Sequence, residues 1–207
     1  MKGKVYLVGA GPGDPELLTV KGQRLLKRCD AIVYDYLVDD RLLEEVSEEA
    51  ERYDVGKRPG RHSVAQEEIE RLIVRLAKAG KTVVRLKGGD PFLFGRGGEE
   101  VRRLRESKIP YEIVPGVTAA LGCAAYVDTP LTHREITSSV TFLSGHEQPD
   151  KEVQSIDWRK HAETESTLVI YMGMGRLEAL AIAVHIKHIH IKTALQAALM
   201  QGHLTEW

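Results

Sequence analysis

Short apolar runs and amphipathic stretches alternate along the first half of the chain. The apolar runs predict buried strands at residues 5–8, 31–34, 52–55, 82–86 and 111–114. The stretches between them predict helices at residues 17–26, 39–49, 65–79 and 99–107. The second of these helices is acidic and is expected to be exposed. A strand followed by a helix about every 25 residues predicts parallel pairing with right-handed crossovers, and therefore an α/β layered domain.

The pattern changes after residue 116. A run of small residues predicts one further helix at 117–125, and apolar runs predict strands at 139–143 and 167–171. We therefore predict a domain boundary near residues 113–118. On this interpretation residues 1–114 form an N-terminal α/β domain and residues 115–207 form a second α/β domain.

The composition is that of an ordinary globular protein. The chain has 207 residues, of which 43% are hydrophobic and 29% are charged, and this excludes intrinsic disorder. Lys and Arg number 29 against 30 Asp and Glu, a net charge of −1. A nucleic-acid partner is disfavoured, because such binding needs an excess of cations. No apolar stretch of the sequence reaches spanning length, so no membrane association is expected.

Cysteine and histidine usage predicts a reduced protein without a metal site. Cys29 and Cys123 stand among apolar residues and cannot form a disulfide framework, which favours core thiols in a cytoplasmic protein. His185, His188 and His190 lie three and two residues apart, a spacing that does not bring all of them to one helical or strand face. No cysteine or carboxylate is interleaved, so no metal ligation is expected.

The loops that follow the strands carry the unusual residues. Ligands of parallel α/β sheets bind beyond the carboxyl ends of the strands, so these loops are the expected site. Residues 9–15, GAGPGDP, are glycine-rich, but Asp14 stands where a dinucleotide-binding fingerprint needs its third glycine. Residues 88–98 contain five glycines, which let the backbone contact a ligand, and Asp90 can accept hydrogen bonds from a ribose or an amino group. A plain structural turn stays the alternative at both loops.

Three further segments have both a binding and a structural interpretation. After the third strand, Lys57, Arg58 and Arg61 stand between or beside glycines, which suits a polycarboxylate or phosphate ligand or else a solvated turn. Residues 115–120 begin a helix whose N-terminal N–H groups face a ligand or water. Met172, beside a glycine, is either core filler or a flexible thioether placed against a flat ring.

Taken together, seven segments resemble, in chain order, the motifs of the tetrapyrrole methylases. They are VGAGPGDPELLT at 8–19, VYDYLV at 33–38, GKR at 56–58, KGGDPFLFGRGGEE at 87–100, PGVTAA at 115–120, PLTHR at 130–134 and YMG at 171–173. The long GGDPFLFGRGGEE run with PLTHR is far more specific than any single glycine motif. The match covers about residues 4–180, and the sequence is most similar to the branch that methylates uroporphyrinogen III.

The resemblance implies an enzyme that transfers two methyl groups from S-adenosylmethionine (SAM) to carbons of adjacent pyrrole rings of uroporphyrinogen III. The product is precorrin-2, which leads to sirohaem and cobalamin. The resemblance also implies a homodimer of chains with two layered αβα domains, with SAM and the active-site cleft between the domains. No metal is implied.

The family motifs also imply roles for individual positions. Asp35 and Lys57 match positions that handle protons. Arg96 matches an arginine at the substrate-facing cleft, and Arg58 and Arg61 offer further forks to the many carboxylates of the substrate. Positions that match cofactor contacts are Pro12, Gly88, Gly89, Asp90, Leu93, Thr118, Ala119 and Met172, with Gly202 added only across a gap.

Two alternatives stay open at this stage. One is another methylase of the same fold, acting on a later precorrin, on rRNA or in diphthamide synthesis. The other is a truncated paralogue that binds SAM or a tetrapyrrole with impaired activity, because the sequence departs from the family pattern after about residue 180. The arginine-rich loops and the GRGGEE run favour methylation of the earliest tetrapyrrole.

Overall fold

A computed structural model describes residues 3–56, 64–145 and 156–176 of the chain. The chain divides into two compact units, Met1–Ala119 and Ala120–Trp207, and each unit is described separately. The boundary expected from the sequence lies at residues 113–118, just before this division.

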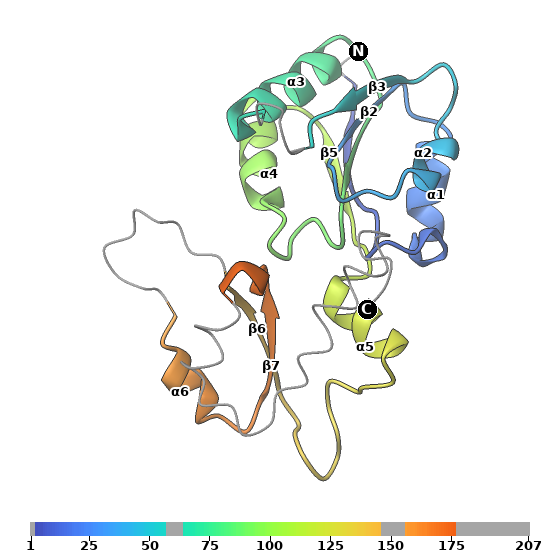
Figure 1. The fold of residues 1–207 in the computed structure, drawn as a ribbon. Helices are drawn as coiled ribbons and strands as arrows, with labels where there is room; N and C mark the ends of the chain where they lie inside the picture. Colours follow the sequence, from blue (N-terminus) through green and yellow to red (C-terminus); the bar gives the residue numbers. More distant parts are fainter. Residues whose placement is uncertain (1–2, 57–63, 146–155, 177–207) are drawn as a thin grey trace. The chain divides into compact units, whose positions relative to one another are not determined.

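In the described residues, five parallel strands form the sheet of the first unit. They are β1 (Val5–Gly9), β2 (Ala31–Tyr34), β3 (Glu51–Asp54), β4 (Val83–Lys87) and β5 (Tyr111–Val114). Their order across the sheet is β3-β2-β4-β1-β5 (Figure 1). Each strand lies within one residue of its predicted bounds, and the predicted α/β fold class with parallel pairing is confirmed.

Helices cover both faces of this sheet (Figure 1). One face carries α1 (Val20–Leu26) and α2 (Arg41–Glu44), and the other carries α3 (Gln66–Lys78) and α4 (Gly97–Glu106). A 3-10 turn, η1 (Pro15–Leu17), precedes α1. The hydroxyl of Thr19 caps α1 by accepting a hydrogen bond from the backbone N–H of Gly22.

The acidic helix expected at residues 39–49 is shorter and less exposed than the sequence suggests. Only α2 is helical in this segment, and Leu42 and Val46 are buried against the sheet. Leu42 and Val46 are four positions apart, so both side chains lie on the side of the segment that packs against the core. Like charges four residues apart, at Glu44 and Glu48, disfavour a longer helix.

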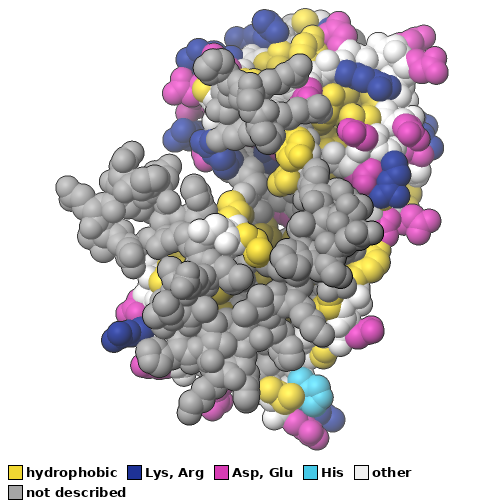
Figure 2. Space-filling view, viewed as in Figure 1, with side chains coloured by type: hydrophobic (Ala, Val, Ile, Leu, Met, Phe, Trp, Pro, Cys, Tyr) yellow, Lys and Arg dark blue, Asp and Glu magenta, His cyan; other side chains and the backbone are white. Residues whose placement is uncertain are grey.

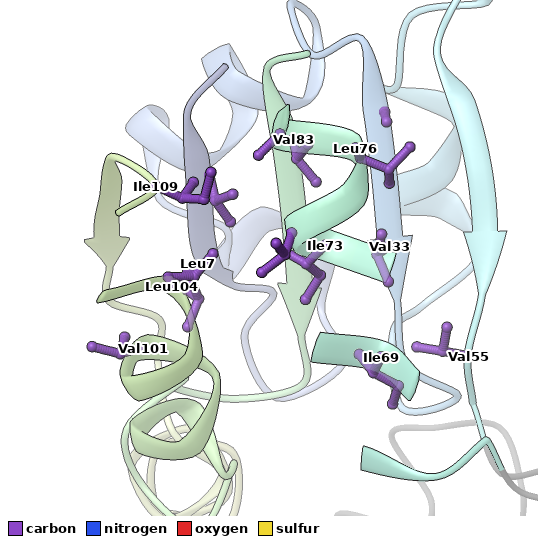
Figure 3. Packing of buried hydrophobic residues seen from close by; sticks show 14 residues of the cluster. Leu7, Val33, Val55, Ile69, Ile73, Leu76, Val83, Val101, Leu104 and Ile109 are labelled. Carbon is purple, nitrogen blue, oxygen red and sulfur yellow. The ribbon is translucent and has the colours of Figure 1, made fainter. Parts of the chain in front are cut away.

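Successive residues of each central strand point to opposite faces of the sheet and pack into two separate hydrophobic clusters. In β4, Val83 packs with residues of α3 and α4, as Figure 3 shows, whereas Val84 packs with residues of α1 and α2. Burial on both faces explains why central strands are near-continuous apolar runs in the sequence. Arg85 and Lys87 interrupt this run in β4, although both side chains are buried.

The described part of the second unit is a smaller α/β element. Helix α5 (Ala119–Tyr126) begins at the division between the units, and β6 (Val140–Ser144) pairs in parallel with β7 (Thr167–Tyr171). Helix α6 (Trp158–Ala162) packs Trp158 against Leu143 of β6. The 3-10 turn η2 (Met174–Arg176) follows β7 (Figure 1).

Charged side chains of both signs lie on the surface of the described residues. On the face drawn in Figure 2, Lys and Arg side chains are interspersed with Asp and Glu over the first unit. Within the described residues no helix is long and apolar enough to cross a membrane, and no cluster of His, Cys, Asp and Glu could hold a metal ion. His185, His188 and His190 lie outside the described residues. Cys29 and Cys123 are buried free thiols.

Candidate active site

The carboxyl ends of β2, β4 and β1 lie side by side at a point where the chain changes direction across the sheet. The helices that follow β1 and β2 cover one face, whereas those that follow β3 and β4 cover the other. Neighbouring strands β2 and β4, and likewise β4 and β1, therefore send their loops to opposite faces. Ligands of open α/β sheets bind in the crevice that such a reversal creates.

The glycine-rich loops after β1 and β4 pair with each other at this edge. The backbone N–H of Gly89 donates to the carbonyl of Gly11 at 2.7 Å, and the N–H of Gly11 donates to the carbonyl of Gly89 at 3.3 Å. Both glycines have positive φ angles, 83° at Gly11 and 64° at Gly89. Residues other than glycine rarely adopt a positive φ angle, so both positions need glycine for the two loops to pair.

The loop after β5 also lies against this pair of loops. A Cβ atom placed on Gly116 would lie 2.2 Å from the carbonyl oxygen of Gly89, and one placed on Gly9 would lie 2.6 Å from the Cα of Gly116. Real Cβ atoms essentially never come this close to backbone atoms. The three loops thus meet at a distance that only glycine permits, and Gly9, Gly11, Gly89 and Gly116 together form a glycine-walled edge.

Asp90 ties two of these loops together. Its Oδ1 accepts a hydrogen bond from the backbone N–H of Phe92 at 2.8 Å, and its Oδ2 accepts one from the N–H of Gly116 at 3.1 Å. The carboxylate therefore has a structural role that the sequence did not reveal. An ionised carboxylate has about four acceptor positions, so these two bonds leave it able to accept from a ligand as well.

Most of the predicted cofactor positions are gathered at this edge. Pro12, Gly88, Gly89, Asp90 and Leu93 lie in the loops after β1 and β4, and a Cβ atom placed on Gly89 would lie 3.9 Å from the Cα of Thr118. Ala119 is the first residue of α5.

A further predicted cofactor position belongs to the second unit. Met172 follows β7 in the second unit, where the Tyr171 hydroxyl accepts a hydrogen bond from the N–H of Ala120 at 3.1 Å. Its side chain is not core filler, because the residue is 56% exposed, and its φ angle is 55°. Four further predicted residues lie outside the described residues: Lys57, Arg58, Arg61 and Gly202.

A cluster of four charged side chains lies where β2 and β4 end. Arg85 and Glu100 are each 1% exposed, Lys87 is 4% exposed, and Asp35 is 30% exposed. Arg85 donates from Nη2 to Asp35 Oδ1 at 2.5 Å and from Nε to Glu100 Oε1 at 3.0 Å. The Lys87 Nζ lies 3.0 Å from Glu100 Oε1 and 3.8 Å from Asp35 Oδ2. Two cations and two carboxylates thus balance, with only Asp35 appreciably exposed.

Burial and the neighbouring charges shift the pKa values of the two cations in opposite directions. Burial lowers the pKa of the Lys87 ammonium, and the neighbouring Arg85 cation lowers it further, which Glu100 and Asp35 offset only in part. Burial also acts to lower the pKa of Arg85, but the carboxylates of Glu100 and Asp35 outweigh it and raise that pKa. Arg85 therefore stays a cation, while Lys87 is the cation that burial disfavours.

From the sequence, Asp35 was singled out as a candidate, whereas Arg85 and Glu100 were not, and Lys87 was only the start of a loop motif. The available signal was the pair of cations at alternate positions of β4, because residues two apart on a strand point to the same face. Nothing in the sequence around Glu100 indicated a buried charge, since an acidic residue in the first turn of a helix is ordinary.

Arg96 lies at the start of α4 and is paired with a neighbour. Its backbone is left-handed, with a φ angle of 57°, and its side chain is 56% exposed. The guanidinium donates from Nε to Glu99 Oε1 at 2.9 Å and from Nη2 to Glu99 Oε2 at 2.6 Å. An incoming carboxylate would therefore compete with Glu99 for this fork.

Comparison with known proteins identifies the family. The family model for Tetrapyrrole (Corrin/Porphyrin) Methylases matches residues 4–201. A siroheme synthase of Pseudoalteromonas translucida is 53% identical over 173 residues, which are 84% of this chain and 36% of that protein. A uroporphyrinogen-III C-methyltransferase of Methanocaldococcus jannaschii is 47% identical over 202 residues, which are 98% of this chain and 83% of that protein.

Comparison with solved structures leads to the same family. The crystal structure of a uroporphyrin-III C-methyl transferase from Thermus thermophilus, complexed with S-adenosylhomocysteine (SAH), superposes with a TM-score of 0.72 at 44% identity, covering 88% of this chain and 72% of that one. The α/β fold of this chain is thus shared with solved structures of tetrapyrrole methyltransferases. The chain belongs to the tetrapyrrole methylase family. It spans 36–38% of the length of several siroheme synthases that it matches.

Proposed function

We propose that this chain transfers two methyl groups from SAM to carbons of uroporphyrinogen III, giving precorrin-2. The observation that carries the proposal is the Asp35 carboxylate at the end of β2, next to β4, whose glycine-rich loop pairs with the loop after β1. The names of the Methanocaldococcus relative and of the SAH-bound Thermus structure support the same substrate and methyl donor.

The glycine-walled edge fits a SAM molecule. Gly88, Gly89 and Asp90 would hold it, with Thr118 on the neighbouring loop, because backbone groups and a carboxylate suit a ribose and an amino acid portion. Bound SAM supplies a methyl group already activated on a sulfonium. The task left to these residues is alignment, for which positioning alone supplies about 7–11 kcal/mol.

Asp35 would take the proton that methylation releases. A pyrrole carbon of the porphyrinogen attacks as an electron-rich nucleophile, which leaves a cationic ring that must lose a proton. The Asp35 carboxylate is the partly exposed member of the charged cluster, so it can reach a substrate while its partners stay buried. The family resemblance assigns a second proton-handling role to Lys57.

Exposed cations would bind the carboxylates of the tetrapyrrole. Arg96 belongs to this set because it is exposed and stands at the start of α4. We add Arg58 and Arg61 from the cation-rich stretch of sequence after the third strand, because arginines offer bidentate forks to carboxylates. We further propose that the protein acts in the cytoplasm and that it forms a homodimer. Light scattering measures the mass in solution, and the mass of a single chain would contradict the dimer.

Incubation with SAM and enzymically made uroporphyrinogen III tests the activity. We expect a red-shifted, fluorescent product whose mass has increased by two methyl groups, and we expect calorimetry to detect SAH binding in the presence of a chelator. Unchanged uroporphyrinogen III together with normal SAH binding would favour a methylase of another substrate or a binding paralogue. SAH binding that disappears with the chelator would contradict metal-independent binding.

Replacing Asp90 with Ala is expected to weaken SAH binding more than tenfold. Loss of a hydrogen bond to a charged group costs about 1.5–3 kcal/mol, and the change also releases the tie between Asp90 and Gly116. Calorimetry measures the affinity. The matched control is Asp157→Ala, which removes a carboxylate that accepts a similar hydrogen bond from the backbone N–H of Lys160 at the start of α6. Equal SAH affinity in both variants would show that Asp90 only shapes a turn.

A further inference from the structure

The charged cluster at the ends of β2 and β4 is poorly explained by stability. Arg85, Lys87 and Glu100 are removed from water, and Oε2 of Glu100 has no hydrogen-bond partner among the described residues. Replacing buried ion pairs by apolar residues of similar volume is often neutral or stabilising. Val83 and Val33 lie on the same face of the sheet, so an apolar continuation of the strands would suit the packing. The charges therefore point to a role other than holding the fold.

The guanidinium of Arg85 is held from several directions. Nη1 donates to the carbonyls of Val33 at 3.3 Å and Leu86 at 3.2 Å, and Nε donates to Glu100 at 3.0 Å. The remaining nitrogen, Nη2, makes the 2.5 Å bond to Asp35 Oδ1. Because the guanidinium is planar, fixing Nη1 and Nε also fixes the direction in which Nη2 points. The position of the Asp35 oxygen is thereby tied to the backbone of the sheet.

Glu100 and Lys87 complete this arrangement. Glu100 Oε1 accepts from Arg85, from Lys87 Nζ at 3.0 Å and from Gln66 Nε2 at 3.2 Å, so it holds both cations in place from α4. Lys87 Nζ lies 3.8 Å from the second oxygen of Asp35. The two oxygens of Asp35 therefore face different cations, and this restricts rotation of the carboxylate.

We propose that Arg85 is a positioning residue that orients the Asp35 carboxylate for proton transfer, with Glu100 and Lys87 holding it in place. The proposal rests on the function proposed above for Asp35. Arg85 is 1% exposed and acts on the substrate only through Asp35. Proton transfer needs the accepting oxygen at hydrogen-bond distance from its donor, so a carboxylate that turns away loses rate while substrate binding is kept.

A double-mutant cycle between Arg85 and Asp35 tests this inference. We expect Arg85→Met to lower kcat about 10²-fold while KM for the tetrapyrrole and the SAH affinity stay unchanged. We expect no further loss when Arg85→Met is added to Asp35→Asn, because residues that act as a unit are not additive. Arg85→Lys, which keeps the charge without the planar fork, is expected to recover part of the rate. The matched control is Arg103→Met, which removes an exposed arginine of α4 that faces Glu106.

Two outcomes of the kinetic and binding measurements would overturn the inference. One is an equal fold loss of kcat from Arg85→Met in the wild-type and Asp35→Asn backgrounds. The other is a loss confined to SAH affinity. Crystal structures of the wild-type protein and the Arg85→Lys variant give a readout that needs no turnover, and an Asp35 carboxylate unmoved in that variant would also count against positioning. A wild-type protein that binds SAH but does not methylate uroporphyrinogen III would instead contradict the proposed function, and these crystal structures would still decide the inference.

Discussion

Replacing Asp35 with Asn is expected to lower kcat for tetrapyrrole methylation about 10²–10⁴-fold, the usual contribution of a general acid or base. An amide has the shape of the carboxylate but cannot accept the proton at this step. Its oxygen can still accept from Arg85, so the local structure is expected to survive. SAH affinity is expected to stay unchanged, because the proposed SAM contacts come from the loops after β1, β4 and β5 and not from β2. Steady-state kinetics and calorimetry measure the two quantities.

Asp39→Asn is the matched control for this variant. Asp39 lies four residues further along the chain and also pairs with an arginine, accepting from Arg41 Nε and Nη2 at 2.9 Å each. It lies outside the charged cluster, so its replacement is expected to leave the kinetics of methylation unchanged. Wild-type kcat in Asp35→Asn, or the same loss of rate in both variants, would show that Asp35 does not handle the proton.

Replacing Glu100 with Gln is expected to lower the free energy of unfolding by about 3–5 kcal/mol, the cost of breaking a buried ion pair by removing one partner. The change leaves Arg85 and Lys87 buried with Asp35 as the remaining carboxylate of the cluster. It also turns an oxygen that accepts from three donors into part of a neutral amide. Urea titration followed by circular dichroism measures the loss.

Glu99→Gln is the matched control on the same helix. Glu99 pairs with Arg96 at the surface, where its side chain is 43% exposed, and such pairs contribute about 0–1 kcal/mol. A loss from Glu100→Gln as small as that from Glu99→Gln would show that water reaches the cluster. It would also remove the reason to seek a functional role for these buried charges.

The fold followed from local patterns that a single sequence displays. Strand positions were correct to within one residue because each central strand is covered on both faces and therefore stands out as an apolar run. The segment at 39–49 was misjudged because its acidic residues outnumber the few apolar ones, although Leu42 and Val46 decide how it packs. Composition describes the exposed side of such a segment better than its buried side.

The candidate site was predicted in part. Glycines at 11 and 89 marked the loops correctly, since a demand for positive φ limits the residue type at one position. The tie from Asp90 to Gly116 was not visible, because the two residues are 26 positions apart. The pairing of Arg96 with Glu99 was also missed, although both residues stood within the quoted motif.

Periodicity, turn chemistry and motif order were thus enough to predict the α/β architecture, the glycine loops and the family of this protein. These properties depend on residues close together in the chain, so they leave a local trace. The charged cluster depends on β2, β4 and α4 meeting in space, and Asp35 and Arg85 are 50 positions apart. Nothing in the residues near Asp35 says which cation will hold it. Only the order of strands across the sheet, which puts β4 beside β2, decides that Arg85 and Lys87 flank its carboxylate.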